Sequence, residues 1–559
     1  MSNIRKLKFA IICESTMLAD WQVDTINELV KSNVAKLDLI IIAENDSSKK
    51  NNKPIVLKII DKLFSRKNFY SLWQRTLKKD RKINLRDEEY FSDANVIKCN
   101  IKKKGKYRDY FDENDLLSIK KNNLDFILRF GLNIITGDIL EVPKYGIWSF
   151  HHGDERKYRG RPACFWEMYN NENKIGGILQ RLNEKLDSGV ILKRWFIKNN
   201  KLSWKDNLEE LRKYGTILPK QVCIDIINSN DNYFFNKPSK TTAKIRYLPT
   251  NKEMVFFAFT IIKNYILFFK KKFMIDSWKI GLIEEKIENY LFNDSKKEIK
   301  WFGSNDKNIF FADPFITKRN EDFIVYFEKF YHNKNRGAIS QFLINKNKVI
   351  IDELDVIKDN NHYSFPFIFE EDNKLYLLPE QMSKNSVQLY KIDKNSGEVL
   401  SKNVILNNIK LSDPTIFSHN SKYWLFGTVD GIKLMAWYTN DIDSPWKEHM
   451  NNPIKIDISS SRNAGGLFYN DGELIRFSQD CSKEYGSRIA LNKILELTKN
   501  SFHEETLKYI EPKSEWDYNE GLHTIGFTND HIIIDAKKSI FHFETFIRKI
   551  IRKIGFKWI

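Results

Sequence analysis

The chain has 559 residues, of which 42% are apolar and 14% aromatic, and a formal net charge of +18. This composition excludes a disordered chain, and at about 100–200 residues per domain the length predicts at least two domains. The basic excess is compatible with a nucleic acid, an anionic lipid or an acidic substrate as partner, or with a lysine-rich surface that has no specific role. The five cysteines show no paired spacing, so a disulfide framework and a zinc site are not supported, and a reducing cytoplasm is expected.

The first 235 residues have the pattern of a parallel sheet covered by helices. Short apolar runs at 8–13 and 37–43 predict strands, the first of them in place of a signal peptide, and residues 21–31 have the spacing of an amphipathic helix. Further strands are expected at 124–130 and 146–151, with a turn at Gly131 followed by a helix through Ile139. This order predicts a Rossmann-like α/β domain over 1–235, with a lysine-rich insertion over 49–105.

Residues 236–275 are predicted to link this domain to the next. They contain KPSKTT near their start, at 237–242, and an aromatic, helix-like run near their end, FFKKKF at 268–273. We expect this linker either to pack on one domain or to touch a membrane surface. No stretch of the chain has the roughly 18 uninterrupted apolar residues that a membrane-spanning helix needs.

The last half repeats one hairpin five times. Each copy is a short apolar strand, a polar turn and a second strand. The copies begin at Ala312, Ser364, Ser412, Asn463 and Gly521. A repeat of about 50 residues is the size of one four-stranded propeller blade, so the sequence predicts a five-bladed β-propeller over 276–538. A β-sandwich could also hold five hairpins, but the regular spacing favours the propeller.

The chain ends in a basic amphipathic pattern over 539–559. Apolar residues recur at helical spacing, with lysines and arginines between them. Such a helix is typical of membrane-surface binding. The alternative is a helix that closes the propeller or docks on the first domain.

Residues 146–190 hold a cluster of chemistry-bearing motifs. His151 and His152 follow a predicted strand, at the sheet edge where open α/β folds bind ligands. Arg159 and Gly160 lie in KYRGRP, and Asp187 lies in LDSG before the next strand. A carboxylate beside an imidazole can fix its tautomer and stabilise its charged form. The alternative is that these are structural groups at strand ends.

These motifs, in this order, resemble the 10-formyltetrahydrofolate-dependent formyltransferase family. The matching pieces are SFH at 149–151, YRG at 158–160, Pro162, Trp166, the glycine pair at 176–177 and LDSG at 186–189, after a lead-in over 124–146. The resemblance implies that a primary amine attacks the formyl carbon of 10-formyltetrahydrofolate. It also implies that His151 and Asp187 are catalytic. Ser149 stands where the family has Asn, and it is the third expected catalytic residue.

The loop after the strand also departs from the family pattern, since HHGDER replaces an apolar run. We therefore expect His152, Asp154, Arg159 and Gly160 to contact a substrate that differs from the family's usual ones. No metal site is expected.

In a propeller, the residues just before each repeated hairpin point toward a common central pocket. This rule predicts a pocket with charged groups that suit a sugar or phosphosugar. Its expected members are Asp313, Asp413, Arg462, Glu520 and His523.

The motif order FADPF, SFPF, LPE, DPTIF, AGG, QDC and GLHT resembles the N-terminal domain of plant glucosamine inositolphosphorylceramide transferases. It is also similar, more loosely, to five-bladed furanosidase-type glycoside hydrolases. Hydrolysis would need paired acids roughly 5–10 Å apart on opposite faces of a bound sugar, which Asp313 with Asp413 or Glu380 could provide. The alternative is that the Asp-Pro pairs only form turns at strand starts.

The sequence therefore predicts an N-formyltransferase-like enzyme acting on a nucleotide- or lipid-linked amino sugar in surface glycan biosynthesis. The propeller is expected to recognise the glycan, and the alternatives are a glycosidase or glycosyl-transfer domain using Asp313, or a glycan-binding protein whose formyltransferase fold is inactive. The expected location is the cytoplasm, peripheral to the inner face of the membrane through 539–559. No segment resembles a nucleic-acid-binding module, and the oligomeric state is left open.

Overall fold

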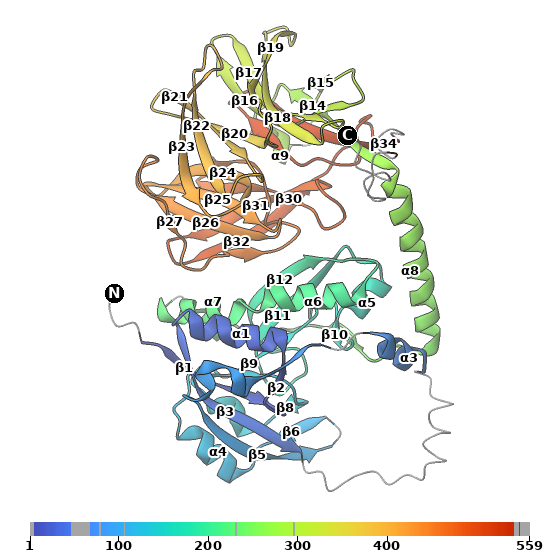
Figure 1. Cartoon of the computed structure of the whole chain (residues 1–559), viewed down its shortest axis with the longest axis vertical. Coiled ribbons are helices and arrows are strands. Elements are labelled where there is room, and N and C mark those ends of the chain that lie inside the picture. Colours follow the sequence, from blue (N-terminus) through green and yellow to red (C-terminus); the bar gives the residue numbers. More distant parts are fainter. Residues whose placement is uncertain are drawn as a thin grey trace. The chain divides into compact units, whose positions relative to one another are not determined.

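The computed structural model describes residues 5–45, 68–77, 80–105, 107–229, 232–293, 297–541 and 547. The chain divides into two units, Met1–Tyr265 and Ile266–Ile559 (Figure 1). The division falls inside one helix, α8 (Asn251–Lys272), within the predicted linker. Most of the predicted C-terminal helix and part of the predicted insertion lie outside the described residues. No described helix is both long and apolar enough to cross a bilayer.

Unit 1 is built on a nine-stranded sheet of order β12-β11-β9-β7-β1-β3-β5-β6-β8. Its central strands are parallel: β9 (Ile147–His151), β7 (Phe126–Arg129), β1 (Leu7–Cys13), β3 (Ala35–Asn45) and β5 (Asn95–Lys104). Antiparallel β11 (Lys174–Arg181) and β12 (Val190–Lys198) extend one edge, and β6 (Arg108–Tyr110) and β8 (Ile134–Ile135) extend the other. Near-continuous apolar strands such as β1 fit this arrangement, because a central parallel strand is buried on both faces.

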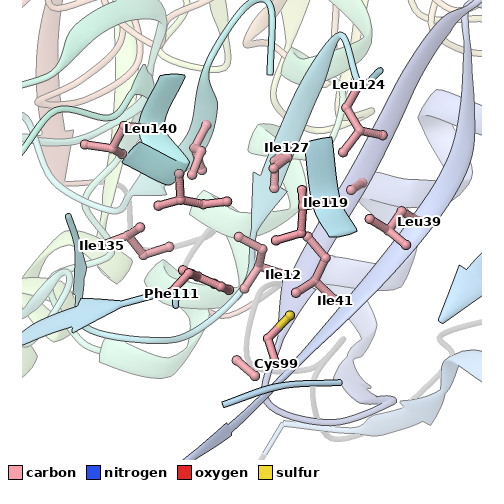
Figure 2. Close-up of a cluster of buried hydrophobic side chains, with 14 of the residues drawn as sticks. Ile12, Leu39, Ile41, Cys99, Phe111, Ile119, Leu124, Ile127, Ile135 and Leu140 are labelled. Atoms are coloured by element: carbon pink, nitrogen blue, oxygen red, sulfur yellow. The ribbon is translucent and has the colours of Figure 1, made fainter. Parts of the chain in front are cut away.

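Helices cover both faces of this sheet (Figure 1). The described helices that lie wholly within unit 1 are α1 (Asp20–Lys31), α3 (Asn68–Thr76), α4 (Glu113–Lys120), α5 (Phe165–Tyr169), α6 (Trp204–Gly215) and α7 (Leu218–Ile227). Helix α1 contacts both α6 and α7, whereas Ile119 of α4 packs against Ile12 and Ile41 in a separate apolar cluster (Figure 2). The remaining short elements are β2 (Met17–Ala19), β4 (Lys82–Asn84), β10 (Arg159–Gly160), β13 (Ile245–Arg246) and the 3-10 turns Leu85–Asp87, Glu89–Phe91, Asp138–Glu141 and Asn232–Phe235.

Two local predictions for unit 1 were wrong. The segment after Gly131 forms β8 and a 3-10 turn rather than a helix, because Gly137 between them has a positive φ of 87° that a right-handed helix excludes. The end of the predicted insertion, from Asn95, is β5 of the central sheet, where it pairs with β3. Its Lys-rich sequence hides the strand, since only one of its faces is buried.

Unit 2 has five blades, and each hairpin predicted from the sequence forms the two inner strands of one blade. Blade 1 is β16 (Ile309–Arg319), β17 (Asp322–Tyr331), β18 (Arg336–Ile344) and β19 (Ile350–Ile357). Blade 2 is β20 (Ser364–Glu371), β21 (Lys374–Glu380), β22 (Ser386–Ile392) and β23 (Val399–Asn407). Blade 3 is β24 (Ser412–His419), β25 (Lys422–Val429), β26 (Lys433–Thr439), β27 (Lys447–Glu448) and β28 (Lys455–Ile456). Blade 4 is β29 (Asn463–Asn470), β30 (Glu473–Asp480), β31 (Arg488–Leu497) and β32 (Phe502–Ile510).

Blade 5 joins strands from both ends of the unit and closes the ring. Its inner strands are β33 (Ile525–Phe527) and β34 (Ile532–Phe541), and its outer strands are β14 (Met274–Ile283) and β15 (Lys300–Phe302). The short helix α9 (Ile287–Phe292) lies between β14 and β15 in the chain. Strand β14 pairs with β34 over ten residues, from Met274 opposite Phe541 to Ile283 opposite Ile532 (Figure 1). The predicted helix therefore does not begin at residue 539, because 539–541 still belong to this strand pair. The predicted fold class, a Rossmann-like α/β domain followed by a five-bladed propeller, is confirmed.

Candidate active site

The carboxyl ends of β7 and β9 bring three polar side chains to one edge of the unit 1 sheet. Arg129 ends β7 and lies opposite Ser149 of β9 in the parallel register, and His151 ends β9. Ser149 is buried, and its hydroxyl lies 3.4 Å from the carbonyl oxygen of Phe150. The carboxyl edge of a parallel sheet is where open α/β folds place ligands.

His151 is held at both ring nitrogens. Its Nδ1 lies 3.3 Å from Oδ1 of Asp187, and its Nε2 lies 2.9 Å from the carbonyl oxygen of Tyr158. A carbonyl oxygen only accepts hydrogen bonds, so Nε2 carries a hydrogen in this arrangement. The second carboxylate oxygen of Asp187 accepts a hydrogen bond from the backbone N–H of Gly160 at 2.9 Å.

The YRG and LDSG motifs bind each other directly. The Arg159 guanidinium donates to the carbonyl oxygen of Leu186 at 2.5 Å, next to the bond between Gly160 and Asp187. Gly160 has a φ of 88° and pairs with Arg246 of β13, where a Cβ would lie 2.2 Å from the Arg246 carbonyl oxygen. Only glycine fits this position, so the motif's glycine brings the backbone N–H to the Asp187 carboxylate.

The structure thus brings together Ser149, His151, Arg159, Gly160 and Asp187, whereas His152 and Asp154 make their contacts elsewhere. The His152 ring packs edge-on against Trp21 at 5.3 Å, and burial lowers its pKa to about 3, so the ring is neutral. Asp154 accepts two hydrogen bonds from the Arg156 side chain, at 2.8 and 2.9 Å.

Arg129 lies at this site but belongs to none of the sequence motifs named above. Burial lowers the pKa of its guanidinium, and the nearby Asp187 carboxylate opposes this effect. The signal in the sequence was its position near the end of the strand predicted over 124–130, directly before Phe130 and the turn at Gly131.

Glu167 of α5 is a buried acid near this segment, and its Oε1 has no hydrogen-bond partner among the described residues. Burial raises its pKa from 4.5 to about 8. Folding therefore favours its protonated form, and the cost of ionising it grows as the pH rises from about 4.5 to 8. Glu167→Gln should make unit 1 more stable than the wild type by a few kcal/mol at pH 8 and leave it nearly unchanged at pH 5.

Urea unfolding across this pH range would measure the effect of Glu167→Gln. The exposed Glu209, paired with Lys205 at 3.1 Å, offers Glu209→Gln as a control whose effect should be small at every pH. A Glu167→Gln effect that does not grow with pH would contradict the raised pKa.

The predicted propeller pocket contains groups that bind neighbouring blades to one another. Asp313 of blade 1 accepts a hydrogen bond from the Thr524 hydroxyl of blade 5 at 2.7 Å and another from the Phe365 N–H of blade 2 at 3.1 Å. Its Oδ1 also lies 3.4 Å from Nε2 of His523. Burial raises the pKa of Asp313, and His523 opposes this.

Asp413 of blade 3 plays the same role on the other side of the ring. Both of its oxygens contact the Arg462 guanidinium, one of them at 3.2 Å, and Gln479 donates to it at 3.0 Å, so it binds blade 4. Its own N–H donates to Glu380 of blade 2 at 2.9 Å. Burial raises the pKa of Asp413 to about 7, against the effect of Arg462.

The other predicted pocket members differ in position. His523 stacks on Trp278 at 4.0 Å, and its Nδ1 lies 2.6 Å from Asp535. Glu520 is exposed and accepts a hydrogen bond from the Ser539 N–H at 2.9 Å, so it is not one of these buried groups. The sequence predicts no metal site, but Asp313, His523 and Asp535 each place one ligand atom within 4.8 Å of the others, a donor set that could hold a metal ion.

Both units resemble known proteins in sequence. Residues 298–524 match the family model described as glucosamine inositolphosphorylceramide transferase 1, N-terminal. The transferase of that name from Oryza sativa subsp. japonica is 32% identical over 205 residues, which are 35% of this chain and 27% of the rice protein. Methionyl-tRNA formyltransferase of Thermodesulfovibrio yellowstonii is 28% identical over 144 residues, 25% of this chain and 45% of the bacterial protein.

Among solved structures, an exo-beta-1,3-galactanase from Phanerochaete chrysosporium with beta-1,3-galactotriose aligns with a TM-score of 0.29 and 16% identity, over 37% of this chain and 54% of that one. The chain covers less than half the length of the rice and bacterial relatives. The predicted resemblances, to formyltransferases in the first part and to the plant transferase domain in the propeller, are confirmed. Relatives of both parts are transferases.

Proposed function

We propose that this chain is an N-formyltransferase that moves a formyl group from 10-formyltetrahydrofolate to the amine of a nucleotide- or lipid-linked amino sugar, in surface glycan biosynthesis. The observation that carries the proposal is the contact of His151 with Asp187, whose carboxylate is itself bound by the Gly160 N–H. The bacterial relative is a formyltransferase, and the name of the rice relative includes glucosamine. The five cysteines are free thiols, in agreement with a cytoplasmic location.

The residues present fit a formyl donor. When bound, 10-formyltetrahydrofolate supplies an acyl carbon attached to a nitrogen leaving group. Transfer of such a group needs hydrogen-bond donors for a developing oxyanion and an acceptor for the amine proton. The His151 ring and the Arg129 guanidinium are donors at the sheet edge, and Asp187 is the acceptor.

Each side chain has a separate task in this mechanism. Asp187 orients the imidazole through Nδ1 and stabilises its charged form. The N–H at Nε2 of His151 now faces the Tyr158 carbonyl oxygen and would donate to the formyl oxygen after a shift away from it. Asp187 would accept the proton that the attacking amine loses and return it to the leaving folate nitrogen.

Ser149 supplies a shorter donor than the family's Asn. Its hydroxyl is buried on β9, between Arg129 of β7 and Gln180 of β11 in the sheet register. A hydroxyl can donate one hydrogen bond. In this proposal it supports the oxyanion together with Arg129.

We propose that the propeller recognises the glycan and does not hydrolyse it. Asp313, Asp413 and Glu380, the acids available for hydrolysis, all accept hydrogen bonds from groups of neighbouring blades. Hydrolysis needs one acid free to donate a proton and a second free to activate water or attack the sugar. If the wild type hydrolyses a glycan and a folded Asp313→Asn variant does not, the glycosidase alternative is favoured.

The proposal is tested with the purified full chain, 10-formyltetrahydrofolate and a panel of nucleotide-linked amino sugars. Release of tetrahydrofolate, with a gain of one CO unit in the mass of one sugar, is the expected result. The absence of both turnover and binding of a folate analogue would contradict it. Glycan binding in that case would identify the chain as a binding protein with an inactive formyltransferase fold.

Gly153→Ala should lower the kcat of this reaction about 10-fold or more, because the ring of His151 must move. A Cβ at Gly153 would lie 2.8 Å from Nε2 of His151 and 3.1 Å from the Tyr158 carbonyl oxygen. Gly466→Ala in the propeller is a matched control, since its Cβ would meet Phe367 at an ordinary 3.5 Å. Steady-state kinetics of both variants measure the difference, and equal activities would show that the position of His151 is unimportant.

A further inference from the structure

Helix α8 has one apolar face that is used for packing. A capping box begins the helix. The backbone N–H of Thr250 donates to the Glu253 carboxylate at 2.7 Å, and the backbone N–H of Glu253 donates back to the Thr250 hydroxyl at 3.3 Å. Met254 and Phe257 are buried, and the Phe257 ring lies 4.6 Å from that of Phe165 in unit 1. This contact accounts for the apolar residues on one side of the first half of α8.

The opposite face of α8 is also apolar, and it is exposed. Residues at alternating steps of four and three share this face, which we name the apolar stripe. Its members and their exposed fractions are Val255 (44%), Phe259 (65%), Ile262 (56%), Ile266 (55%) and Phe269 (61%). Further exposed apolar side chains flank it: Phe256 (51%), Tyr265 (54%), Leu267 (48%) and Phe268 (47%). Single exposed apolar residues are common on proteins, but a continuous patch of this kind marks an interaction surface.

The charges on α8 all have one sign after its first turn. From 254 to 272 the only charged residues are Lys263, Lys270, Lys271 and Lys272. Lys263 and Lys270 are exposed and directly follow Ile262 and Phe269 of the stripe. Lys271 pairs with Glu484, so the helix keeps an excess of positive charge beside its apolar stripe.

We propose that the apolar stripe of α8 binds the surface of a membrane that contains anionic phospholipid. An amphipathic helix lies in the interface when its apolar face enters the acyl boundary and its lysines reach the phosphates. The exposed Phe and Tyr side chains suit this depth, where one side is apolar and the other is wet. Since α8 is not apolar enough to cross the bilayer, it lies along the surface.

Charge distinguishes this partner from a second copy of the chain. Its apolar residues recur at alternating steps of four and three, a spacing that also allows two helices to pair. Two copies of α8 would bring lysines together with no acidic side chain of 254–272 to pair with them. Anionic lipid supplies the missing negative charge, so the membrane is the occupant that the observations favour.

A fluorescent label on the stripe tests the proposal in the full chain. All five native cysteines are buried, so Phe259→Cys can be labelled selectively with an environment-sensitive dye. The dye should brighten and shift to the blue with phosphatidylcholine vesicles that contain phosphatidylglycerol, much less with phosphatidylcholine alone, and less as salt is added. Leu400→Cys on β23 is the matched control, because Leu400 is 57% exposed and should stay in water. No change at position 259, or the same change at both positions, would overturn the proposal.

A charged variant of the stripe gives an independent measurement. Phe259→Asp combined with Ile262→Asp should reduce cosedimentation with the phosphatidylglycerol vesicles about 10-fold or more, with unchanged circular dichroism. Equal cosedimentation of this variant and the wild type would place the lipid contact elsewhere and overturn the proposal. Sedimentation velocity without vesicles tests whether the stripe instead binds a second copy of the chain. If the wild type is a dimer that this variant dissociates, and the variant binds vesicles as well as the wild type does, the stripe pairs two copies.

Discussion

Asp187→Asn should lower the kcat of formyl transfer about 100-fold or more while leaving the melting temperature nearly unchanged. The amide keeps an oxygen for the Gly160 N–H, so the turn that joins YRG to LDSG can persist. A neutral group beside Nδ1 of His151 no longer stabilises the imidazolium, and it cannot accept the amine proton. Release of tetrahydrofolate under saturating substrate measures the loss.

Asp154→Asn is the control for this prediction. Asp154 lies in the same segment as His151, but its carboxylate binds Arg156. We expect its kcat to remain within a few-fold of the wild type. Full activity of Asp187→Asn, or an equal loss in both variants, would contradict the role given to Asp187.

Asp413→Ala should destabilise the propeller by about 3–5 kcal/mol at pH 8, where the pair with Arg462 is ionised. Both partners are buried, with side-chain exposures of 2% and 17%, and removal of the carboxylate leaves the guanidinium without its main partner. The Gln479 amide also loses its acceptor on this carboxylate. Calorimetry of the propeller transition measures the effect.

Two further variants make this test specific. Asp430→Ala removes an exposed aspartate that pairs with Lys433 at 3.2 Å and should cost less than about 1 kcal/mol. The combination Asp413→Leu with Arg462→Met removes both charges and should recover part of the stability lost in Asp413→Ala. If Asp413→Ala unfolds at the wild-type temperature, the aspartate does not hold the blades together.

The role of Asp413 also affects how loss of glycan binding is interpreted. Asp313 and Asp413 were predicted from the sequence as pocket residues, and the structure shows each of them bound to two neighbouring blades. A variant at either position can therefore lose binding because the ring loosens. Binding measurements on these variants need the stability measurement beside them.

The sequence by itself determined the local elements and the two fold classes. Strands such as Leu7–Cys13 and the five hairpins were predictable because apolar periodicity and turn residues act over a few positions. The pairing of His151 with Asp187 was predictable only because whole motifs matched a known family in order. Spacing alone could not show that residues 36 positions apart would meet.

Only the tertiary structure decided which polar groups share a site. His152 and Glu520 were themselves predicted as site residues, but the ring of the first packs against aromatic side chains and the second is exposed to solvent. Ring closure by β14 and β34 joins segments about 260 residues apart, which no local pattern encodes. The apolar stripe of α8 became visible only when Met254 and Phe257 were seen to use the other face. Periodicity reports which side chains share a face, whereas contacts between distant segments decide which faces remain free.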